Sequence, residues 1–94
     1  MIKKIIFLLA LGYSLVQAND LEAGWNALQA KEYTKAAVLF ERSCNQKNGI
    51  ACYNLGLMYQ KGNGVKQNCA KALALYEKAC KNGEPAGCEN LDCN

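Results

Sequence analysis

Residues 51–88 read ACYNLGLMYQKGNGVKQNCAKALALYEKACKNGEPAGC, and this stretch continues a pattern that begins before it. Shifting the chain against itself by 36 residues aligns Lys35-Ala36 with Lys71-Ala72. The same offset aligns Leu39 with Leu75, Phe40-Glu41 with Tyr76-Glu77, Cys44 with Cys80, Cys52 with Cys88, and Asn54-Leu55 with Asn90-Leu91. A period in the thirties that is carried by helical segments is typical of a helical repeat array.

Spacing of apolar residues predicts helices over residues 20–30, 34–46, 50–61 and 68–82. Thr34 and Asn68 are the residues expected to cap two of them, because their side-chain oxygens can accept from free backbone N–H groups. Asn48-Gly49 and the run 62–64 are turn signals between helices. Pro85 suits the first turn of a last helix. Since no segment reads as a strand, the predicted fold class is all-α.

Two glycines fall inside the predicted helices at matching places in the repeat. Gly24 and Gly56 each cost a helix about 1 kcal/mol relative to alanine. We therefore expect a close approach between helices at both positions.

The first 18 residues predict a cleaved signal peptide. They combine Lys3 and Lys4, an apolar run over 5–16 and small residues before Asn19. An apolar run of about 12 residues is shorter than the roughly 20 that a membrane-spanning helix requires. Residues 19–94 are then the mature domain, secreted or periplasmic, with no stable membrane span after cleavage. Such a compartment permits disulfides among the six cysteines.

Charge and composition argue against several classes of function. Removing Lys3 and Lys4 from the 11 basic residues leaves nine against eight acidic residues, so there is no basic footprint for nucleic acid. Histidine is absent, which disfavours the common zinc sites, and neither cysteine pair has the C-x-x-C redox spacing. No cofactor and no metal is expected.

The repeat resembles a known family. The Sel-like repeat, a relative of the tetratricopeptide repeat, is matched at Ala51, Leu55, Gly56, Tyr59, Gly62, Gly64, Val65, Lys71, Ala72, Tyr76, Ala79, Gly83 and Ala86. The paired cysteines further resemble the Helicobacter cysteine-rich proteins. This resemblance implies a short α-solenoid of antiparallel helix hairpins stapled by disulfides, in units of about 20–47, 48–83 and a partial 84–94. In the first unit the short KEY at 31–33 replaces the longer loop at 61–68, so it is closer to a plain tetratricopeptide repeat.

The same resemblance implies how four cysteines pair. In that family a bridge joins the second helix of one repeat to the first helix of the next, which pairs Cys44 with Cys52 and Cys80 with Cys88. A short helical hairpin can bring such positions within the roughly 4.4–6.8 Å Cα separation of a disulfide. Each closed loop of about nine residues is expected to stabilise the fold by about 2.5 kcal/mol.

Cys69 and Cys93 lie outside the repeat frame. An intramolecular bridge between them is favoured slightly over two free thiols or a mixed disulfide with another chain. Cys69 lies 11 residues before Cys80, whereas Cys93 lies five after Cys88. At about 1.5 Å per helical residue the two would be out of register unless the chain end bends.

The function predicted from these features is a scaffold that binds a protein or peptide. Stacked helix pairs form extended binding surfaces, and Tyr53 and Asn54 are the candidate partner contacts. The alternative is the β-lactamase or penicillin-binding activity assigned to some relatives, with a β-lactam as ligand. Ser43 is followed by Cys44-Asn45-Gln46, so S-x-x-K is absent and no catalytic residue is assigned. With barely two units, the chain also fits a shortened relative whose binding face is incomplete.

Overall fold

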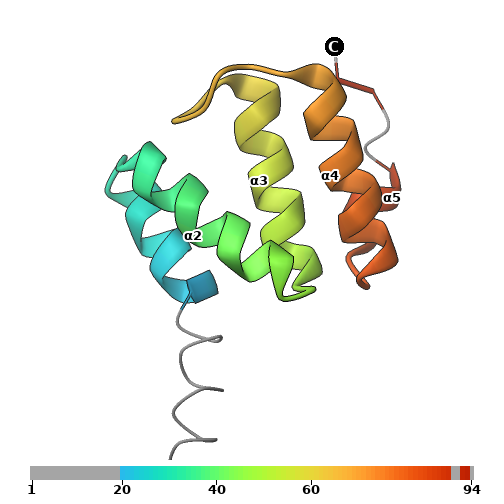
Figure 1. The fold of residues 1–94 in the computed structure, drawn as a ribbon, viewed down its shortest axis with the longest axis horizontal. Coiled ribbons are helices and arrows are strands. Elements are labelled where there is room, and N and C mark those ends of the chain that lie inside the picture. The colour runs from blue at the N-terminus through green and yellow to red at the C-terminus, as the bar shows by residue number, and fades with distance from the viewer. Residues whose placement is uncertain (1–19, 90–91, 94) are drawn as a thin grey trace, which may run out of the picture.

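The protein is a row of helices, each packed against the next (Figure 1). The computed structural model describes residues 20–89, 92 and 93. Residues 20–29 are helical and are followed by α2 (Tyr33–Asn45), α3 (Gly49–Lys61), α4 (Cys69–Lys81) and α5 (Pro85–Glu89). None of the described residues lies in a strand, and the all-α prediction is confirmed. The expected signal peptide, residues 1–18, lies outside the described residues.

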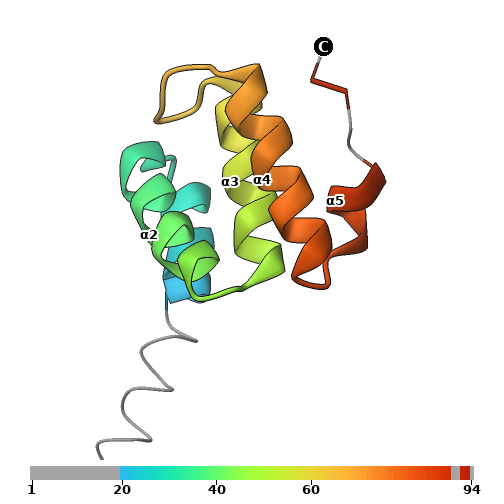
Figure 2. The same ribbon diagram turned by 45° about the vertical axis from the view of Figure 1, so that its right-hand side comes forward.

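Consecutive helices form hairpins. Helix 20–29 and α2 make the first, α3 and α4 make the second, and α5 follows α4 after a short turn. Figure 2 shows α5 on the side of α4 that faces away from α2. The contact between α2 and α3 therefore lies inside the stack. Helices α4 and α5 form the outer side of the stack, away from α2.

Asparagine side chains cap the N-termini of two helices. Asn48 Oδ1 accepts from the backbone N–H of Ala51 at 3.1 Å, and Asn68 Oδ1 accepts from that of Lys71 at 3.0 Å. Each bond satisfies a donor that has no partner inside its helix. At the other end of α3, Gly62 adopts a left-handed φ of 74° and donates to Met58 O. The predicted cap at Asn68 is confirmed.

The predicted cap at Thr34 is wrong. Helix α2 begins at Tyr33, and the residue before it, Glu32, makes no side-chain cap bond. The connection from helix 20–29 is so short that Glu32 N–H still donates to Ala27 O, while Ala36 N–H already donates to Glu32 O. This tight reversal places Thr34 inside the first turn of α2 rather than before it.

Matching aromatic residues fill the two hairpins. Phe40 of α2 and Tyr76 of α4 are both fully buried. A Cβ added to Gly24 would lie 2.7 Å from Phe40 Cε1, and one added to Gly56 would lie 2.6 Å from Tyr76 Cε1. Carbon atoms do not approach that closely without strain, so only glycine lets each ring lie against the facing helix backbone. The predicted close approach at both glycines is confirmed.

The loop over residues 62–68 ties the second hairpin to the first. Gly64, at a left-handed φ of 73°, leaves no room for a Cβ against the Tyr33 backbone at the start of α2. The Asn68 N–H donates to Tyr59 O at 2.9 Å and closes the loop back onto α3. A side chain at residue 64 would separate the loop from α2.

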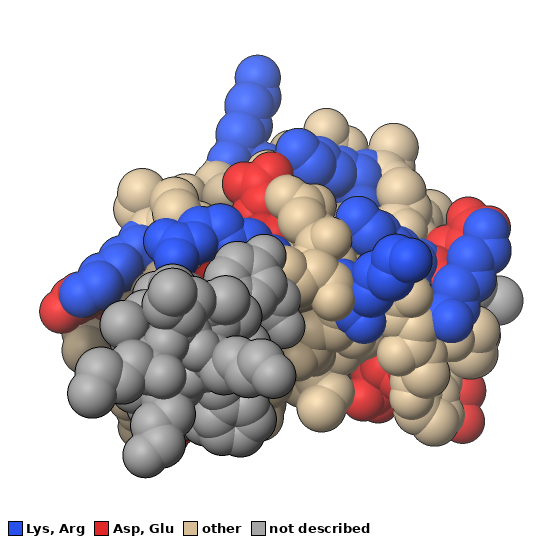
Figure 3. Space-filling view, turned by 60° about the horizontal axis from the view of Figure 1, so that its bottom comes forward, with Lys and Arg blue, Asp and Glu red and all other residues tan. Residues whose placement is uncertain are grey.

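Several basic side chains lie at the end of the stack where α2 and α4 finish. Arg42 lies in the last turn of α2, and Lys78 and Lys81 lie in the last turn of α4. Positive charge there complements the unpaired carbonyls of a helix C-terminus. Figure 3 shows that lysine and arginine side chains form a band on this end, with acidic side chains among and beside them. Arg42, Lys78 and Lys81 are thus explained by the helix ends at which they lie.

Candidate functional site

A buried disulfide closes the junction between the two hairpins. Cys44, near the end of α2, is bonded to Cys52 in the first turn of α3, with their Cα atoms 4.6 Å apart. Only 1% of Cys44 and none of Cys52 is exposed. Between them the chain reverses through Lys47, whose φ is 67°. Sulfur atoms shielded in this way are chemically inert, so this bridge serves as a staple.

The matching disulfide at the outer end is open to solvent. Cys80, near the end of α4, is bonded to Cys88 of α5, with their Cα atoms 4.8 Å apart. Cys80 is half-buried and Cys88 is exposed. The two junctions share one bonding pattern but differ in how much protein covers the sulfur atoms.

The third bridge joins Cys69, the first residue of α4, to Cys93, with their Cα atoms 5.5 Å apart. Neither residue 92 nor Cys93 belongs to a helix. The bridge therefore forms although Cys93 lies only five residues after Cys88, so the difference in register noted in the sequence does not keep the two cysteines apart.

Equivalent faces of α2 and α4 differ in burial. Position 37 in α2 is a buried alanine with 6% exposure, and α3 packs over this helix. Its counterpart in α4, Leu73, is larger and only half-buried. The same contrast holds for Cys44 against Cys80 and for Cys52 against Cys88. At these three positions the first unit is therefore more deeply buried than the second.

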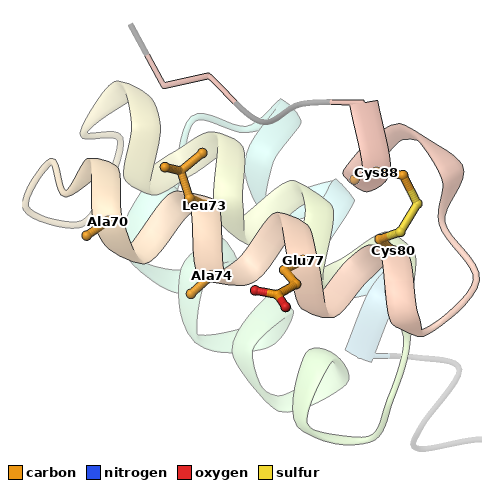
Figure 4. A pocket seen from close by; sticks show the side chains of 7 residues that line it. Ala70, Leu73, Ala74, Glu77, Cys80 and Cys88 are labelled. Carbon is orange, nitrogen blue, oxygen red and sulfur yellow. A yellow bond between two sulfur atoms is a disulfide. The ribbon is translucent and has the colours of Figure 1, made fainter.

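An open groove of about 490 Å³ occupies this outer face. Figure 4 shows Leu73 along one edge of the groove, with Ala70, Ala74 and Glu77 along the other. The Cys80–Cys88 disulfide closes one end. The four α4 residues are spaced i, i+3, i+4 and i+7, which places them in one stripe of the helix. The volume falls in the range of sites that hold ligands.

Sequence reasoning missed this groove, although the chain carries a signal for it. Helix α4 buries Ala72, Leu75, Tyr76 and Ala79. The segment also holds apolar residues at 70, 73 and 74, outside that buried set. A helix that is apolar on two faces has a second surface to cover. The repeat periodicity alone did not separate the two faces.

The predicted contacts Tyr53 and Asn54 are both half-buried. The ring of Tyr53 packs against Tyr76, with centroids 5.5 Å apart at an interplanar angle of 42°. Burial, with a smaller contribution from the neighbouring Tyr53, raises the pKa of Tyr76 above that of an ordinary tyrosine. The Asn54 amide donates to Ile50 O of its own helix at 2.9 Å. Both side chains thus already contact their own protein, and they lie apart from the residues that line the groove.

Trp25 of helix 20–29 is 39% exposed. Helix 20–29 has α2 on one side, and the described residues provide no second helix to cover this ring.

Ser43 is buried inside α2. It is 1% exposed, and its Oγ has no hydrogen-bond partner within the described structure. A serine nucleophile needs an adjacent base and an approach for the substrate. Ser43 has neither, so the only serine of residues 19–94 is not placed for attack on a β-lactam.

The part of the chain that the structure describes contains neither a metal site nor a membrane-spanning helix. Across residues 20–89, 92 and 93, no group of three histidine, cysteine, aspartate or glutamate side chains is arranged to hold a metal ion. No helix within these ranges has the length and apolar character needed to cross a bilayer.

Comparison with known proteins gives a consistent picture of the family. The family model for the Sel1 repeat matches residues 8–48 and 49–84. HcpD of Helicobacter pylori strain J99 is 44% identical over 71 residues, which cover 71% of this chain and 23% of HcpD. Beta-lactamase HcpA of the same strain is 32% identical over 50 residues, covering 53% of this chain and 20% of HcpA.

A plant protein is similar to part of this chain as well. The ERAD-associated E3 ubiquitin-protein ligase component HRD3B of Arabidopsis thaliana is 38% identical over 62 residues, covering 66% of this chain and 9% of HRD3B. The matched region spans less than a quarter of each of these three relatives.

Proposed function

This chain belongs to the Sel1 repeat family, and on that premise we propose that it is an extracytoplasmic scaffold that binds a protein or peptide partner. The resemblance to the Helicobacter cysteine-rich proteins supports the same assignment. Helix pairs stacked in series offer extended surfaces for partners. The observation that carries the proposal is the matched pair of junction disulfides, which fixes the stacking of successive helices.

Disulfides at both junctions also support the proposed location. Six cysteines form three bridges, and such bridges persist in oxidising compartments. A chain of this size gains much of its stability from such staples. We place the mature domain, residues 19–94, in the periplasm or outside the cell after removal of residues 1–18, with repeat units of about 20–47, 48–83 and 84–94.

The proposal is tested by crosslinking. The full chain is expressed with its own N-terminal segment in a bacterial host and purified oxidised from the periplasm, and its mass shows whether residues 1–18 are removed. A photoreactive group at exposed Lys78 is then used to capture proteins from envelope extract of the source cells. We expect a crosslink that saturates, is competed by unlabelled protein, and is lost when the chain is reduced and alkylated.

Absence of any saturable crosslink from several labelled positions would contradict the scaffold. A second contradicting result would be hydrolysis of a chromogenic cephalosporin by an activity that copurifies with the oxidised chain. That result would favour an enzyme over a scaffold. Ser43→Ala would then show whether the buried hydroxyl takes part.

A further inference from the structure

We propose that Asn63, in the loop over residues 62–68, is a modification site at which the folded protein deamidates spontaneously. The products are aspartate and isoaspartate, and the isoaspartate form loosens this loop from α2. Water is the co-reactant and ammonia is the leaving group, so the reaction needs no enzyme. The inference goes beyond the scaffold function and does not depend on it.

The chemistry follows from an asparagine that precedes a glycine. Asparagine is a thermally labile residue, and a following glycine has no Cβ to hinder its backbone nitrogen. That nitrogen loses its proton and attacks the side-chain carbonyl carbon of the asparagine, and the side-chain nitrogen leaves as ammonia. Water then opens the cyclic imide at either carbonyl. One opening gives aspartate, and the other gives isoaspartate, whose main chain is longer by one methylene group.

The chain holds three dipeptides of this kind: Asn48-Gly49, Asn63-Gly64 and Asn82-Gly83. The reacting atoms are the same in all three. Differences in their rates in the folded protein must therefore come from the structure around each dipeptide.

The first dipeptide is restrained by a helix cap and by burial. Asn48 Oδ1 accepts from the backbone N–H of Ala51 at 3.1 Å, so turning this side chain onto the Gly49 nitrogen would break the cap of α3. Gly49 is buried, and a Cβ added to it would lie 2.8 Å from Asn82 O. Ring closure has neither a free side chain nor free space here.

The dipeptide at the end of α4 is restrained through its backbone. The Gly83 N–H, whose proton must be lost, donates to Cys80 O at 3.2 Å. Asn82-Gly83 also lies inside the short loop that the Cys80–Cys88 disulfide closes. The first dipeptide lies in the same way inside the loop closed at residues 44 and 52. Both reactions therefore require a stapled helix junction to open.

These restraints do not apply at Asn63-Gly64. Within the described structure the Asn63 side chain has no hydrogen-bond partner, and the Gly64 N–H donates to no acceptor. The dipeptide lies outside the loops closed by the three disulfides. Ring closure requires only that the loop lift from α2, and a local opening of this kind costs less than the opening of a stapled junction.

The isoaspartate product changes the contact between the two hairpins. Gly64 has a left-handed φ of 73° and no room for a Cβ against the Tyr33 backbone. A longer main chain at residue 63 displaces Gly64 from this position, so the loop no longer fits against the start of α2. The aspartate product keeps the original main chain and therefore keeps the contact.

Peptide mapping by mass spectrometry tests the choice of site. The oxidised full chain is incubated at mildly alkaline pH, and the reduced, alkylated and denatured chain gives the intrinsic rate at each dipeptide. The ratio of folded to denatured rate should be at least about tenfold larger at Asn63 than at Asn48 or Asn82, because protected groups react only through local opening. The matched control is Asn63→Gln, whose longer side chain cyclises far more slowly, and it should lose the fast conversion.

NMR spectra of the separated products test the structural effect. The isoaspartate form should shift the amide signals of Tyr33 and the first turn of α2. The variant Asn63→Asp, which has the main chain of the other product, should shift only amides next to residue 63. A folded-to-denatured ratio at Asn63 no larger than at Asn48 or Asn82 would overturn the site. An isoaspartate form with an unmoved Tyr33 amide would overturn the effect on the hairpins.

Discussion

Gly56 and Tyr76 lie so close that a single methyl group on the glycine would reach within 2.6 Å of the ring. The ring belongs to α4 and the glycine to α3, and Phe40 stands in the same relation to Gly24 in the preceding hairpin. This pairing sets how closely the two helices of each hairpin approach. Both rings are fully buried in consequence.

Gly56→Ala should destabilise the protein despite the better helix propensity of alanine. The gain in propensity is about 1 kcal/mol, and overpacking against a buried ring costs about 1–3 kcal/mol. We expect a net loss of about 1 kcal/mol in urea unfolding. Lys78→Ala, at an exposed helix position, should change the stability by less than about 0.5 kcal/mol. An unchanged or more stable Gly56→Ala would show that the ring moves freely.

The two junction disulfides should differ in their rates of reduction. Thiol–disulfide exchange requires access of a thiolate to sulfur. Cys88 is exposed, whereas Cys44 and Cys52 are 1% and 0% exposed. Brief treatment of the native protein with a small thiol, followed by alkylation and peptide mass mapping, should label Cys80 and Cys88 before Cys44 and Cys52. Simultaneous labelling of both pairs would mean that reduction proceeds only through global unfolding.

Removing the inner bridge should cost more than opening the outer one. The double change Cys44→Ala and Cys52→Ala deletes a closed loop of about nine residues, worth about 2.5 kcal/mol. It also removes sulfur atoms packed in the core. Cys80→Ala with Cys88→Ala loses the loop term but little packing. Thermal unfolding of the two variants should therefore place the inner one lower, and the reverse order would contradict this difference in packing.

Alkaline pH should destabilise the protein through Tyr76. Burial raises the pKa of this phenol, with Tyr53 adding to the effect. The folded state then holds the proton more tightly than the unfolded chain, so the stabilisation is complete below the unfolded pKa of about 10. It is lost as the pH rises through the folded pKa.

The Tyr76→Phe variant tests this pH dependence. Because its hydroxyl donates to Gln60 Oε1, the change should cost about 1 kcal/mol at neutral pH. Urea unfolding should nevertheless show a shallower alkaline decline for Tyr76→Phe than for the parent. Parallel declines would assign the effect to other groups.

The ion pair between Asp20 and Arg42 should contribute more than an exposed pair. Arg42 Nη2 lies 3.0 Å from Asp20 Oδ1, and the Asp20 side chain is 6% exposed. Arg42→Ala leaves this carboxylate buried without its partner, which should cost about 1–3 kcal/mol. Lys81→Ala breaks the exposed pair with Glu77 and should cost less than about 0.5 kcal/mol. Equal effects in chemical denaturation would show that solvent reaches Asp20.

Much of the helical framework could be predicted from the sequence because its signals are local. Asn68 and Gly62 mark helix ends through their own side chain and backbone freedom. Gly24 and Gly56 indicate close packing, because the helix stability that a glycine loses must be compensated by a contact. The cap predicted at Thr34 was wrong, because the tight turn from helix 20–29 into α2 decides where α2 begins.

What the sequence alone determined is the repeat: its 36-residue period, its helices and the family to which it belongs. Tertiary structure decided which copies of a repeated position are covered. Cys52 and Cys88 are the same residue in the same frame, yet one is sealed beneath neighbouring helices and the other faces solvent. The burial of a residue depends on the helices that pack against its unit. A periodic sequence has the same residue at both positions, so it does not reveal this difference.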